Sequence, residues 1–350
     1  MRLYIYGAGI MAYGAYKAIR ELFCVTPEGF LVTDKKGQPV QIGGIPVYLI
    51  EECVDSLSDS LILIATPEEY QASIEQELIK RHLFHYQKID SHVEYKLMGS
   101  YLKRAIGISL IEDYQAEKLT DEENEACVYM AVSHKDKKMD RNYKEEAWVK
   151  KIQVGAALTG VRIAEITDEG AESLSGENAL YGELTASYYA WKHNKQKITG
   201  LFHYRRVLHI TQKQLSLLSA GIIDVVLPLP FVCIPDASGQ YGRYLLPEDI
   251  DVMTKVLKEH EPEENRSFLT LLKTPYLYNY NILIARKEVF DHYCGWLFSL
   301  LEEIKNRCEQ TERQRMPRYI GRIGEVLTSL YFMRNERNWK IAHAEKIWRV

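Results

Sequence analysis

Three polar side chains with cationic character follow a short apolar stretch in the middle of the chain. Residues 198–202 are predicted to form a buried strand, and His203, Arg205 and Arg206 come directly after it. The α/β proteins place ligand groups at the carboxyl ends of strands, and these side chains suit a ligand with two or more negative charges, above all a diphosphate. The alternative is a solvated strand end, because charged clusters more often cover a surface than serve a site.

The segment before this cluster is predicted to be one helix. Residues 178–193 read N-A-L-Y-G-E-L-T-A-S-Y-Y-A-W-K-H, and Leu184, Tyr188 and Trp191 recur at the spacing of one helical face. Glu183 falls on a neighbouring, more polar face. We therefore expect an amphipathic helix whose apolar stripe is separate from its one glutamate.

The composition is typical of a globular protein and shows no bias toward nucleic acid. The 350 residues allow two domains, and the net charge of -4 excludes the basic field that nucleic-acid-binding proteins carry. The six cysteines form no C-x-x-C pair of the kind found in zinc or redox sites. With no signal peptide and no apolar run of about 20 residues, the sequence predicts a cytoplasmic protein without a membrane span.

The N-terminal part reads as a strand, a glycine-rich turn and a helix. Gly7, Gly9 and Ala12 form a G-x-G-x-x-A pattern in which a phosphate can approach backbone N–H groups at the helix start. Asp34 follows a second strand and is placed to bind ribose hydroxyls. We predict a small Rossmann-like domain at residues 1–95 that binds a nucleotide or nucleotide sugar; a purely structural domain and an NAD-dependent oxidoreductase are the alternatives.

A polar junction at residues 96–125 is interpreted as a linker to a second domain at residues 126–350. The charge run at residues 121–125 fits a solvated linker or helix end. The second domain opens with a strand that ends in His134 and Lys135. Because the end of the first strand of an α/β sheet lies close to a bound nucleotide, these two side chains are candidate ligand contacts, an ordinary loop being the alternative.

Several motifs of the second domain occur together in a recognisable order. They are S-H-K, D-E-G, L-S-x-x-N, E-L-T-A-x-Y-x-A-W-K, G-L-x-H-Y-R-R and a late R-x-x-G-x-x-x-E at residues 318–325. In this order they resemble the bacterial capsular-polysaccharide and lipopolysaccharide glycosyltransferases catalogued as domain of unknown function 4422, over residues 127–333. The I-Y-G-A-G start and the G-G-I-P-V segment resemble small nucleotide-sugar-binding Rossmann domains attached to bacterial polysaccharide enzymes.

The resemblance implies a nucleotide-sugar-dependent transferase with a GT-A-like α/β fold. Sugar transfer releases a diphosphate, so His203, Arg205 and Arg206 are candidates to hold the developing negative charge. Glu183 is the candidate base toward the acceptor hydroxyl, the alternative being a surface glutamate paired to lysine or arginine. A UDP-sugar is the expected donor, and the candidate donor-binding residues are His134, Lys135, Asp168, Asn178, Tyr204 and Asn281.

A divalent metal, Mn²⁺ or Mg²⁺, is an open but less favoured cofactor. GT-A enzymes often hold one with an Asp-x-Asp motif, and the pattern here is Asp249-Ile250-Asp251. After a proline, these acids fit the first turn of a helix better than a metal site. Asp168 and Glu169 are rival ligands. We favour neutralisation of the diphosphate by the cationic cluster without metal.

The expected acceptor is a glycan or a lipid-linked glycan of capsule or lipopolysaccharide synthesis. The C-terminal residues 335–350 mix basic side chains with Trp339 and Trp348, as lipid interfaces do, so peripheral contact at the inner face of the membrane is a hypothesis. A long amphipathic helix at residues 290–304 is interpreted as core. The main alternative to an enzyme is a non-catalytic nucleotide-sugar sensor or assembly factor of polysaccharide synthesis.

Overall fold

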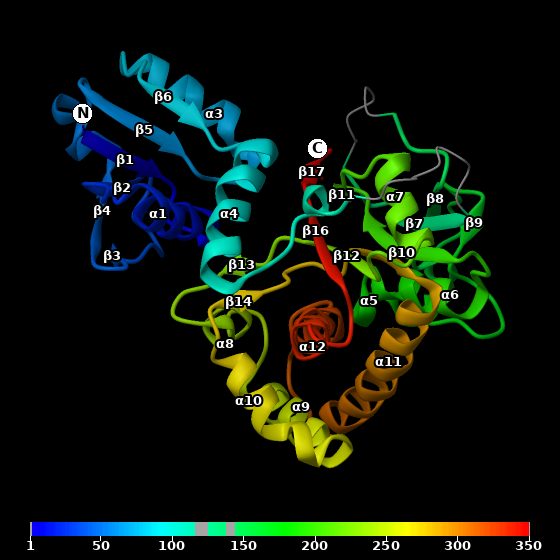
Figure 1. Ribbon diagram of the computed structural model, residues 1–350. Helices are drawn as coiled ribbons and strands as arrows, with labels where there is room; N and C mark the ends of the chain where they lie inside the picture. The colour runs from blue at the N-terminus through cyan, green and yellow to red at the C-terminus, as the bar shows by residue number, and fades with distance from the viewer. Residues whose placement is uncertain (1, 116–124, 138–143, 350) are drawn as a thin grey trace. The chain divides into compact units, whose positions relative to one another are not determined.

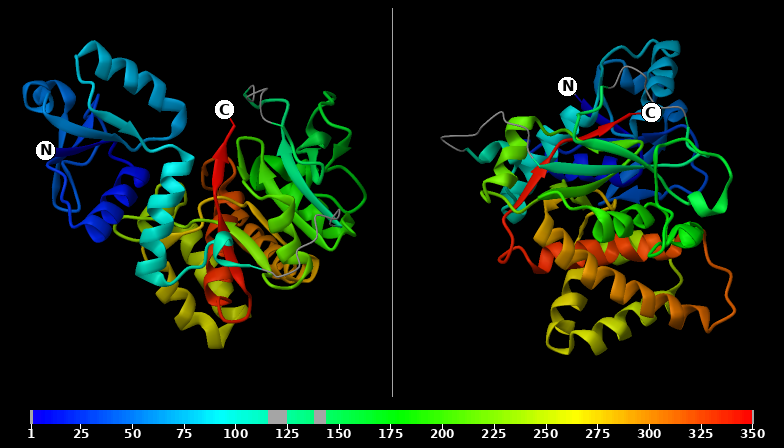
Figure 2. Two further views of the ribbon diagram at one scale, coloured as in Figure 1. Left: turned by 45° about the horizontal axis from the view of Figure 1, so that its top comes forward. Right: turned by 90° about the vertical axis from the view of Figure 1, so that its right-hand side faces the viewer.

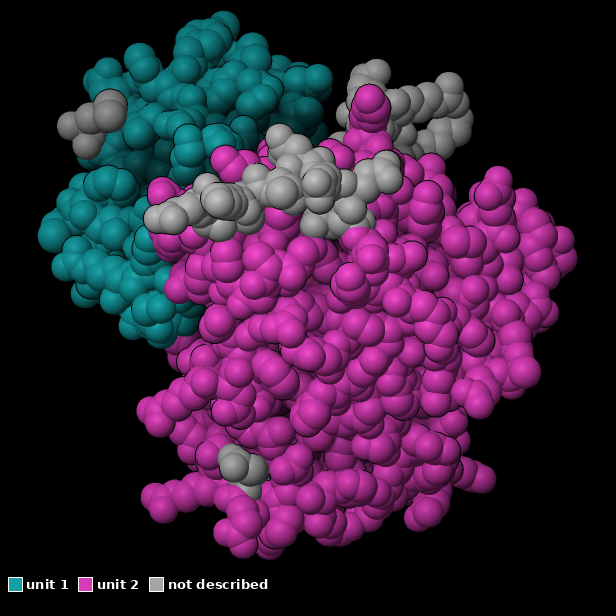
Figure 3. Space-filling view, turned by 45° about the vertical axis from the view of Figure 1, so that its right-hand side comes forward, with its two compact units in different colours: residues 1–108, 231–234 teal, residues 109–230, 235–350 magenta. Residues whose placement is uncertain are grey.

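The computed structural model describes residues 2–115, 125–137 and 144–349, which form two compact units (Figure 3). Unit 1 comprises Met1–Ile108 together with Phe231–Ile234, and unit 2 comprises Ser109–Pro230 and Pro235–Val350. Each unit contains its own hydrophobic core. The chain therefore builds two cores, as its length allows.

Unit 1 is an α/β fold around a six-stranded sheet in the order β3-β4-β2-β1-β5-β6. Neighbouring strands are parallel except for β3, which pairs antiparallel with β4. The strands are β1 (Arg2–Tyr6), β2 (Gly29–Val32), β3 (Gln41–Ile42), β4 (Ile45–Leu49), β5 (Ser60–Ile64) and β6 (Tyr86–Lys88), and β13 (Phe231–Val232) is counted with this unit. The helices are α1 (Ile10–Phe23), α2 (Val54–Leu57), α3 (Glu68–Lys80) and α4 (Ser91–Ile106).

Helix α4 corrects the linker predicted at residues 96–125. It packs on α1, where the side chain of Met98 lies against Gly14. Residues 96–106 therefore belong to unit 1, because a buried apolar face fixes a helix to its neighbour regardless of its polar surface. Unit 2 begins at Ser109. The predicted charge run at 121–125 lies outside the described residues except for its last glutamate.

Unit 2 is built around a nine-stranded mixed sheet with the main order β16-β12-β15-β10-β7-β8-β9. Along this path the described strands are parallel to their neighbours except for β15, which runs against β10 and β12. Antiparallel β11 and β17 extend the sheet beside β10. The strands are β7 (Ala126–Val132), β8 (Val149–Gln153), β9 (Ile166–Thr167), β10 (Ile198–His203), β11 (Arg206–Leu208), β12 (Val225–Pro228), β15 (Leu283–Arg286), β16 (Ile341–Ala344) and β17 (Lys346–Trp348), with β14 (Tyr276–Leu277) outside the sheet.

Helices form a thick layer on one side of this sheet. The right-hand view of Figure 2 shows α9 to α12 gathered below it, and Figure 1 labels them. The helices of unit 2 are α5 (Asn178–Tyr181), α6 (Leu184–His193), α7 (Gln212–Ser219), α8 (Ala237–Tyr241), α9 (Pro247–His260), α10 (Asn265–Leu272), α11 (Lys287–Glu309) and α12 (Tyr319–Arg334). Helix α11 carries ten buried side chains, which confirms the interpretation of residues 290–304 as core.

Successive side chains of the central strands point to opposite faces of the sheet, so every second side chain faces the layer that contains α6. In β7, Met130 belongs to the core cluster on one face, whereas Tyr129 packs edge-on against Tyr189 of α6 on the other. The parallel register between β7 and β10 puts Phe202 in the same core cluster as Met130. His203, the next residue, therefore faces the layer that contains α6.

The described helices also bear on the predicted absence of a membrane span. None of them combines the length and the apolar character that crossing a bilayer requires. The C-terminal segment for which lipid contact is hypothesised contains β16 and β17. Mixed α/β architecture with parallel strands in both sheets agrees with the predicted fold class.

Candidate active site

A tight turn between β10 and β11 carries the predicted cationic residues. His203 pairs with Arg206 across the turn, and Arg206 pairs in turn with Trp348 of β17. The backbone N–H of Arg349 donates to the carbonyl oxygen of Arg205 at 3.0 Å. The C-terminal strand therefore holds the turn, and both arginines are only partly exposed.

Two neighbouring cavities border this turn and share Glu183, His203 and Arg318 as lining residues. The first has a volume of about 240 Å³ and lies at the carboxyl end of β7, with Ser133, Lys135, Asp136, Asn178 and Tyr204 among its walls. The second has a volume of about 270 Å³ and is lined by Arg205, Arg206, Tyr244, Tyr280, Arg322 and Glu325, among others. The shared residues form the wall between the two cavities.

Aromatic rings position two of the arginines in the second cavity. The guanidinium of Arg206 lies 4.0 Å from the ring centre of Tyr280 and 4.3 Å from that of Trp348. Arg322 lies 4.0 Å from the ring centre of Tyr244. Stacking of this kind fixes a guanidinium plane while leaving its N–H groups free to bind.

The same cavity contains guanidiniums that form no direct ion pair with a carboxylate of the described residues. Arg205, Arg206 and Arg322 form no ion pair with a carboxylate of the described residues, and the Nε atom of each is buried without a hydrogen-bond partner there. Arg318, by contrast, is paired with Glu183. Because buried charged donors are costly unless they are paired, this arrangement is suited to an anionic ligand.

Glu183 lies at a break in the helix predicted for residues 178–193. That prediction of a single helix is wrong, because Gly182 adopts φ 60° and ψ −134° and separates α5 from α6. The side chain of Glu183 is 8% exposed and forms an ion pair with Arg318. Its Oε1 also accepts a hydrogen bond of 3.0 Å from Nδ2 of Asn281. The glutamate is thus a buried, doubly held carboxylate.

Close backbone packing brings Arg318 to this carboxylate. Arg318 precedes α12 with a left-handed φ of 63°. A Cβ atom at Gly182 would lie 2.4 Å from its Nε, and one at Gly321 would lie 2.7 Å from the carbonyl oxygen of Tyr181. The R-x-x-G-x-x-x-E motif therefore docks α12 against α5 and leads its first arginine to Glu183.

Two groups on the shared wall titrate away from their usual ranges. Burial raises the pKa of Glu183, but Arg318, His203 and hydrogen bonds outweigh it and hold the pKa below its usual value. Burial lowers the pKa of His203 to about 4, against the pull of Glu183 and with the help of the nearby arginines. His203 is therefore neutral at pH 7, so the predicted cluster consists of two cations and one neutral imidazole. Its Nδ1 accepts the N–H of Arg205 at 3.3 Å, which leaves the ring proton on Nε2.

Two further carboxyl groups line the cavities and were not predicted as site residues. Burial raises the pKa of Asp136 to about 6, although its hydrogen bond from the N–H of Ser133 opposes this. Burial and then the charge of Glu183 raise the pKa of Glu325 to about 7, with Arg322, Arg318 and Arg206 opposing. Both groups change charge near neutral pH.

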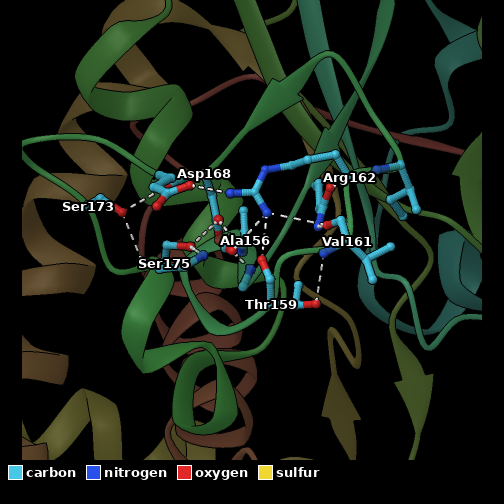
Figure 4. Close-up of polar contacts among 12 residues, drawn as sticks. Ala156, Thr159, Val161, Arg162, Asp168, Ser173 and Ser175 are labelled. Atoms are coloured by element: carbon cyan, nitrogen blue, oxygen red, sulfur yellow. Dashed lines mark hydrogen bonds and ion pairs between the residues drawn. The ribbon is translucent and has the colours of Figure 1, made fainter.

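Asp168, a predicted donor contact and rival metal ligand, has a different environment (Figure 4). Its buried carboxylate accepts the N–H groups of Gly155 at 2.8 Å and Ala156 at 3.1 Å, together with the hydroxyls of Ser175 and Thr185. It lines neither cavity. The structure thus uses Asp168 to fix the loop between β8 and α5, because internal donors occupy its oxygens.

The other predicted donor contacts divide between the cavities. Lys135, Asn178 and Tyr204 line the first cavity, and Asn281 lines the second. The amide of Asn178 also donates to a backbone carbonyl at 2.7 Å, so part of its role is local. His134 is exposed and lines neither cavity.

The residues weighed as metal ligands are engaged elsewhere. Within residues 2–115, 125–137 and 144–349, no three His, Cys, Asp or Glu side chains form a group that could hold a metal ion. Asp249 lies in the first turn of α9, as predicted, and both its oxygens accept from Nε of Arg315 at 3.0 Å. Glu169 pairs with Arg162 at 2.9 Å. Each of these two carboxylates therefore has an arginine partner.

The predicted nucleotide site of unit 1 has an open turn. Gly7 has a φ of 123°, and a side chain at Gly9, the residue before α1, would meet no atom within 4 Å. Asp34 is exposed and accepts the N–H of Lys36 at 2.8 Å. Ala12 is fully buried, so it acts only through close packing of α1 on the sheet.

Six further residues line or border the cavities outside the set of site residues predicted from the sequence. They are Asp136, Tyr244, Tyr280, Arg322, Glu325 and Trp348, all from loops or from elements far from the predicted cluster. Arg322 and Glu325 lie within or beside the late R-x-x-G-x-x-x-E motif, so that motif contained the available signal. Trp348, named in the hypothesis of lipid contact, packs on Arg206.

Comparison with known proteins identifies relatives of this fold. Residues 128–336 match the model of a family described as a domain of unknown function, DUF4422. No curated protein matches the chain. Among solved structures, the chain is similar to the apo structure of WbbM, a bifunctional glycosyltransferase, with a TM-score of 0.57 and 23% identity. The match covers 65% of this chain and 45% of that one, so the chain spans less than half the length of WbbM. At this identity the likeness shows a shared fold.

Proposed function

The chain belongs to the DUF4422 family, and we propose that its second unit is a glycosyltransferase acting on a nucleotide-sugar donor and a glycan acceptor. The observation that carries the proposal is the second cavity, where Arg205 and Arg206 present guanidiniums without carboxylate partners among the described residues. A diphosphate leaving group needs fixed positive charge where its own negative charge develops. The fold shared with a solved glycosyltransferase supports the same assignment.

The donor is proposed to extend from the first cavity toward the β10–β11 turn. The nucleoside lies at the carboxyl end of β7, beside Lys135, Asp136 and Tyr204, where α/β folds bind nucleotides. The carboxylate of Asp136 is suited to accept hydrogen bonds from ribose hydroxyls. The diphosphate then meets Arg205 and Arg206, so that the sugar lies near the wall shared by both cavities.

The reaction is proposed to take place at this shared wall. The bond between the anomeric carbon and the diphosphate oxygen breaks, a bond from the acceptor oxygen to the same carbon forms, and the nucleoside diphosphate leaves. Glu183 accepts the proton of the acceptor hydroxyl, because its lowered pKa keeps it ionised at neutral pH. Asn281 orients that carboxylate. The Nε2–H group of His203 can donate one hydrogen bond to the substrate.

Charge neutralisation is assigned to the arginines and not to a divalent metal. Two guanidiniums in a partly buried site can stabilise a diphosphate by charge-assisted hydrogen bonds. The proposal therefore expects activity to survive a chelator such as EDTA. Complete loss of transfer in EDTA, restored by Mn²⁺ or Mg²⁺, would contradict this part of it.

Unit 1 is proposed as a second nucleotide site, and lipid-linked glycans as one class of acceptor at the inner face of the membrane. The open turn at Gly9 and the exposed Asp34 support the first point. Titration of the protein with NAD tests the oxidoreductase alternative, and titration with UDP or a UDP-sugar should show two sites, one of which Asp34→Ala weakens. Flotation with liposomes tests membrane contact. If the protein contacts the membrane, we expect it to bind anionic vesicles.

One experiment tests the function directly. The full chain is titrated with a panel of UDP-, GDP- and CMP-sugars, UDP-sugars being the expected donors, and release of the nucleotide (UDP, GDP or CMP) is followed with glycan acceptors present. We expect binding of one nucleotide class and turnover with at least one acceptor. Binding with no turnover across the panel would favour the non-catalytic sensor, and absence of any binding would overturn the proposal.

A further inference from the structure

The second cavity holds more unpaired positive charge than the diphosphate of an intact nucleotide sugar carries. Arg318 has Glu183 as its counter-charge, but Arg205, Arg206 and Arg322 have no carboxylate partner among the described residues. The diphosphate of a nucleotide sugar carries one negative charge on each phosphate. One guanidinium of the cavity is therefore left without a counter-charge when the donor is bound.

Arg322 is the guanidinium set apart from the other two. Arg205 and Arg206 lie on the β10–β11 turn, whereas Arg322 lies on α12, about one helical turn beyond Arg318. Its guanidinium stacks on Tyr244 at 4.0 Å, and its Nε is buried without a partner in the described part of the chain. A second wall of the cavity thus presents its own fixed cation.

Glu325 does not neutralise Arg322. It follows Arg322 by three residues on α12 and lines the same cavity, yet the two form no ion pair. Burial and the nearby Glu183 raise the pKa of Glu325 to about 7, while arginines of α12 and of the β10–β11 turn oppose. At neutral pH this carboxyl group is therefore only partly charged, and Arg322 keeps its binding capacity for an external anion.

We propose that the acceptor carries an anionic group, a carboxylate or a phosphate, that binds Arg322 while the donor diphosphate occupies Arg205 and Arg206. The inference rests on the proposed function and names the acceptor class as an acidic or phosphorylated glycan. A guanidinium fork matches both anions in geometry. The rings of Tyr244 and Tyr280 give the same cavity apolar faces beside its cations, as sugar binding requires.

The test uses the full chain saturated with P1,P2-dimethyl pyrophosphate, called pyrophosphate below, whose single negative charge on each phosphate matches the donor diphosphate. Ligand-observed NMR then measures the affinities of glucuronate, glucose 6-phosphate and methyl glucoside. We expect at least one of the two anionic sugars to bind about tenfold more tightly than the neutral glucoside, and the better of the two identifies the anionic group. Arg322→Gln should remove this preference and leave the pyrophosphate affinity within about twofold.

Matched variants make the result specific. Arg243→Gln removes an exposed arginine next to Tyr244 and should change neither affinity. Arg322→Lys keeps the charge without the planar fork and should retain part of the preference; it serves if the glutamine variant does not fold. The proposal is overturned if anionic and neutral sugars bind alike, if pyrophosphate displaces the anionic sugar, or if Arg322→Gln weakens pyrophosphate binding as much as Arg205→Gln does.

Failure of the proposed function has a different signature. In that case neither pyrophosphate nor UDP, GDP or CMP binds to the wild-type protein, and the variants have nothing to change. Saturable binding of pyrophosphate with equal affinities for the three sugars would leave the transferase assignment standing and remove only the anionic acceptor.

Discussion

Unit 2 contains two partly buried charged regions that treat their ionised groups in opposite ways. The carboxylate of Asp168 accepts hydrogen bonds from two backbone N–H groups and two hydroxyls. In the second cavity, the guanidiniums of Arg205, Arg206 and Arg322 each have a buried Nε without a partner among the described residues. The charged group of the first region has all its hydrogen-bond partners within the protein. The charged groups of the second region need an external anion as their partner.

The difference in hydrogen-bond partners distinguishes a charged group that stabilises the fold from one that is suited to bind a ligand. A fully satisfied network stabilises a fold, since each of its members offsets the desolvation of another. Unsatisfied buried donors weaken a fold and persist only where another requirement keeps them. Asp168, Arg205 and Arg206 were all predicted as site residues, so residue type alone could not separate the two regions.

The largest effect is expected from the unsatisfied region. Arg205→Gln should reduce sugar transfer about a thousandfold, because a fixed cation is lost where the leaving group develops charge. The unfolding temperature should stay the same or rise, since no internal carboxylate loses its partner. Steady-state kinetics and thermal unfolding of the same preparation measure both effects.

Arg243→Gln serves as the control for this substitution, because that arginine is exposed and lines neither cavity. It should leave the rate unchanged. Near-normal transfer by Arg205→Gln would contradict the proposed role of Arg205 in ligand binding. A loss of stability that accounts for the lost activity would contradict it as well.

The satisfied region should respond in the reverse manner. Asp168→Ala leaves two backbone N–H groups and two hydroxyls without their acceptor, and we expect it to destabilise the protein by about 3 kcal/mol. Urea unfolding measures this loss. Transfer per folded molecule should remain within about threefold of the wild-type rate, since the carboxylate lines neither cavity. A stable but inactive Asp168→Ala protein would show that Asp168 is a donor ligand after all.

A smaller effect is expected at the residue that positions Arg206. Trp348→Ala removes a ring whose centre lies 4.3 Å from the guanidinium, and stacking of this kind contributes about 1 kcal/mol. The affinity for the nucleotide sugar should fall about fivefold with a smaller change in kcat. A titration of both proteins with the same donor checks this, and an unchanged affinity would mean that Tyr280 alone positions the arginine.

The smallest expected effect is a pH dependence of donor affinity. The pKa of Glu325 is raised to about 7, so the group is ionised at pH 8 and protonated at pH 6. Loss of its negative charge as pH falls should strengthen diphosphate binding by about threefold. A nucleotide-sugar diphosphate does not itself titrate in this range, which makes it the suitable probe.

Glu325→Gln should bind the donor at pH 8 as tightly as the wild type does at pH 6. Protonation of Asp136, whose pKa is raised to about 6, removes an acceptor for the ribose hydroxyls, so this variant should bind the donor more weakly as pH falls below 6. Affinity that rises between pH 7 and pH 8 in the wild type would contradict the role assigned to Glu325.

Much of the fold could be predicted because local pattern decides it. Strands β1, β7 and β10 are short apolar runs, and α9 and α11 follow from a proline start and an apolar stripe. The break at Gly182 was missed, because the helical pattern continues across it and only a φ of 60° interrupts it. The linker was misplaced because composition does not show that Met98 packs on α1.

The site was only half predictable for a related reason. The cluster at Arg205 and Arg206 could be predicted from its position after a strand. Whether a charged group is paired within the protein depends on partners that lie far along the chain. Arg318 reaches Glu183 across 135 residues, and no local pattern specifies that pair. Asp168 was predicted as a ligand contact from the sequence. Its four hydrogen-bond donors come from separate segments that only the fold brings together, so the sequence did not reveal them.

A crystal structure with UDP bound tests the central claim most directly. The account predicts that the uridine lies at the carboxyl end of β7 and that the diphosphate oxygens accept hydrogen bonds from Arg205 and Arg206. A structure in which UDP binds in unit 2 away from both guanidiniums, with their Nε atoms still unpaired, would contradict it.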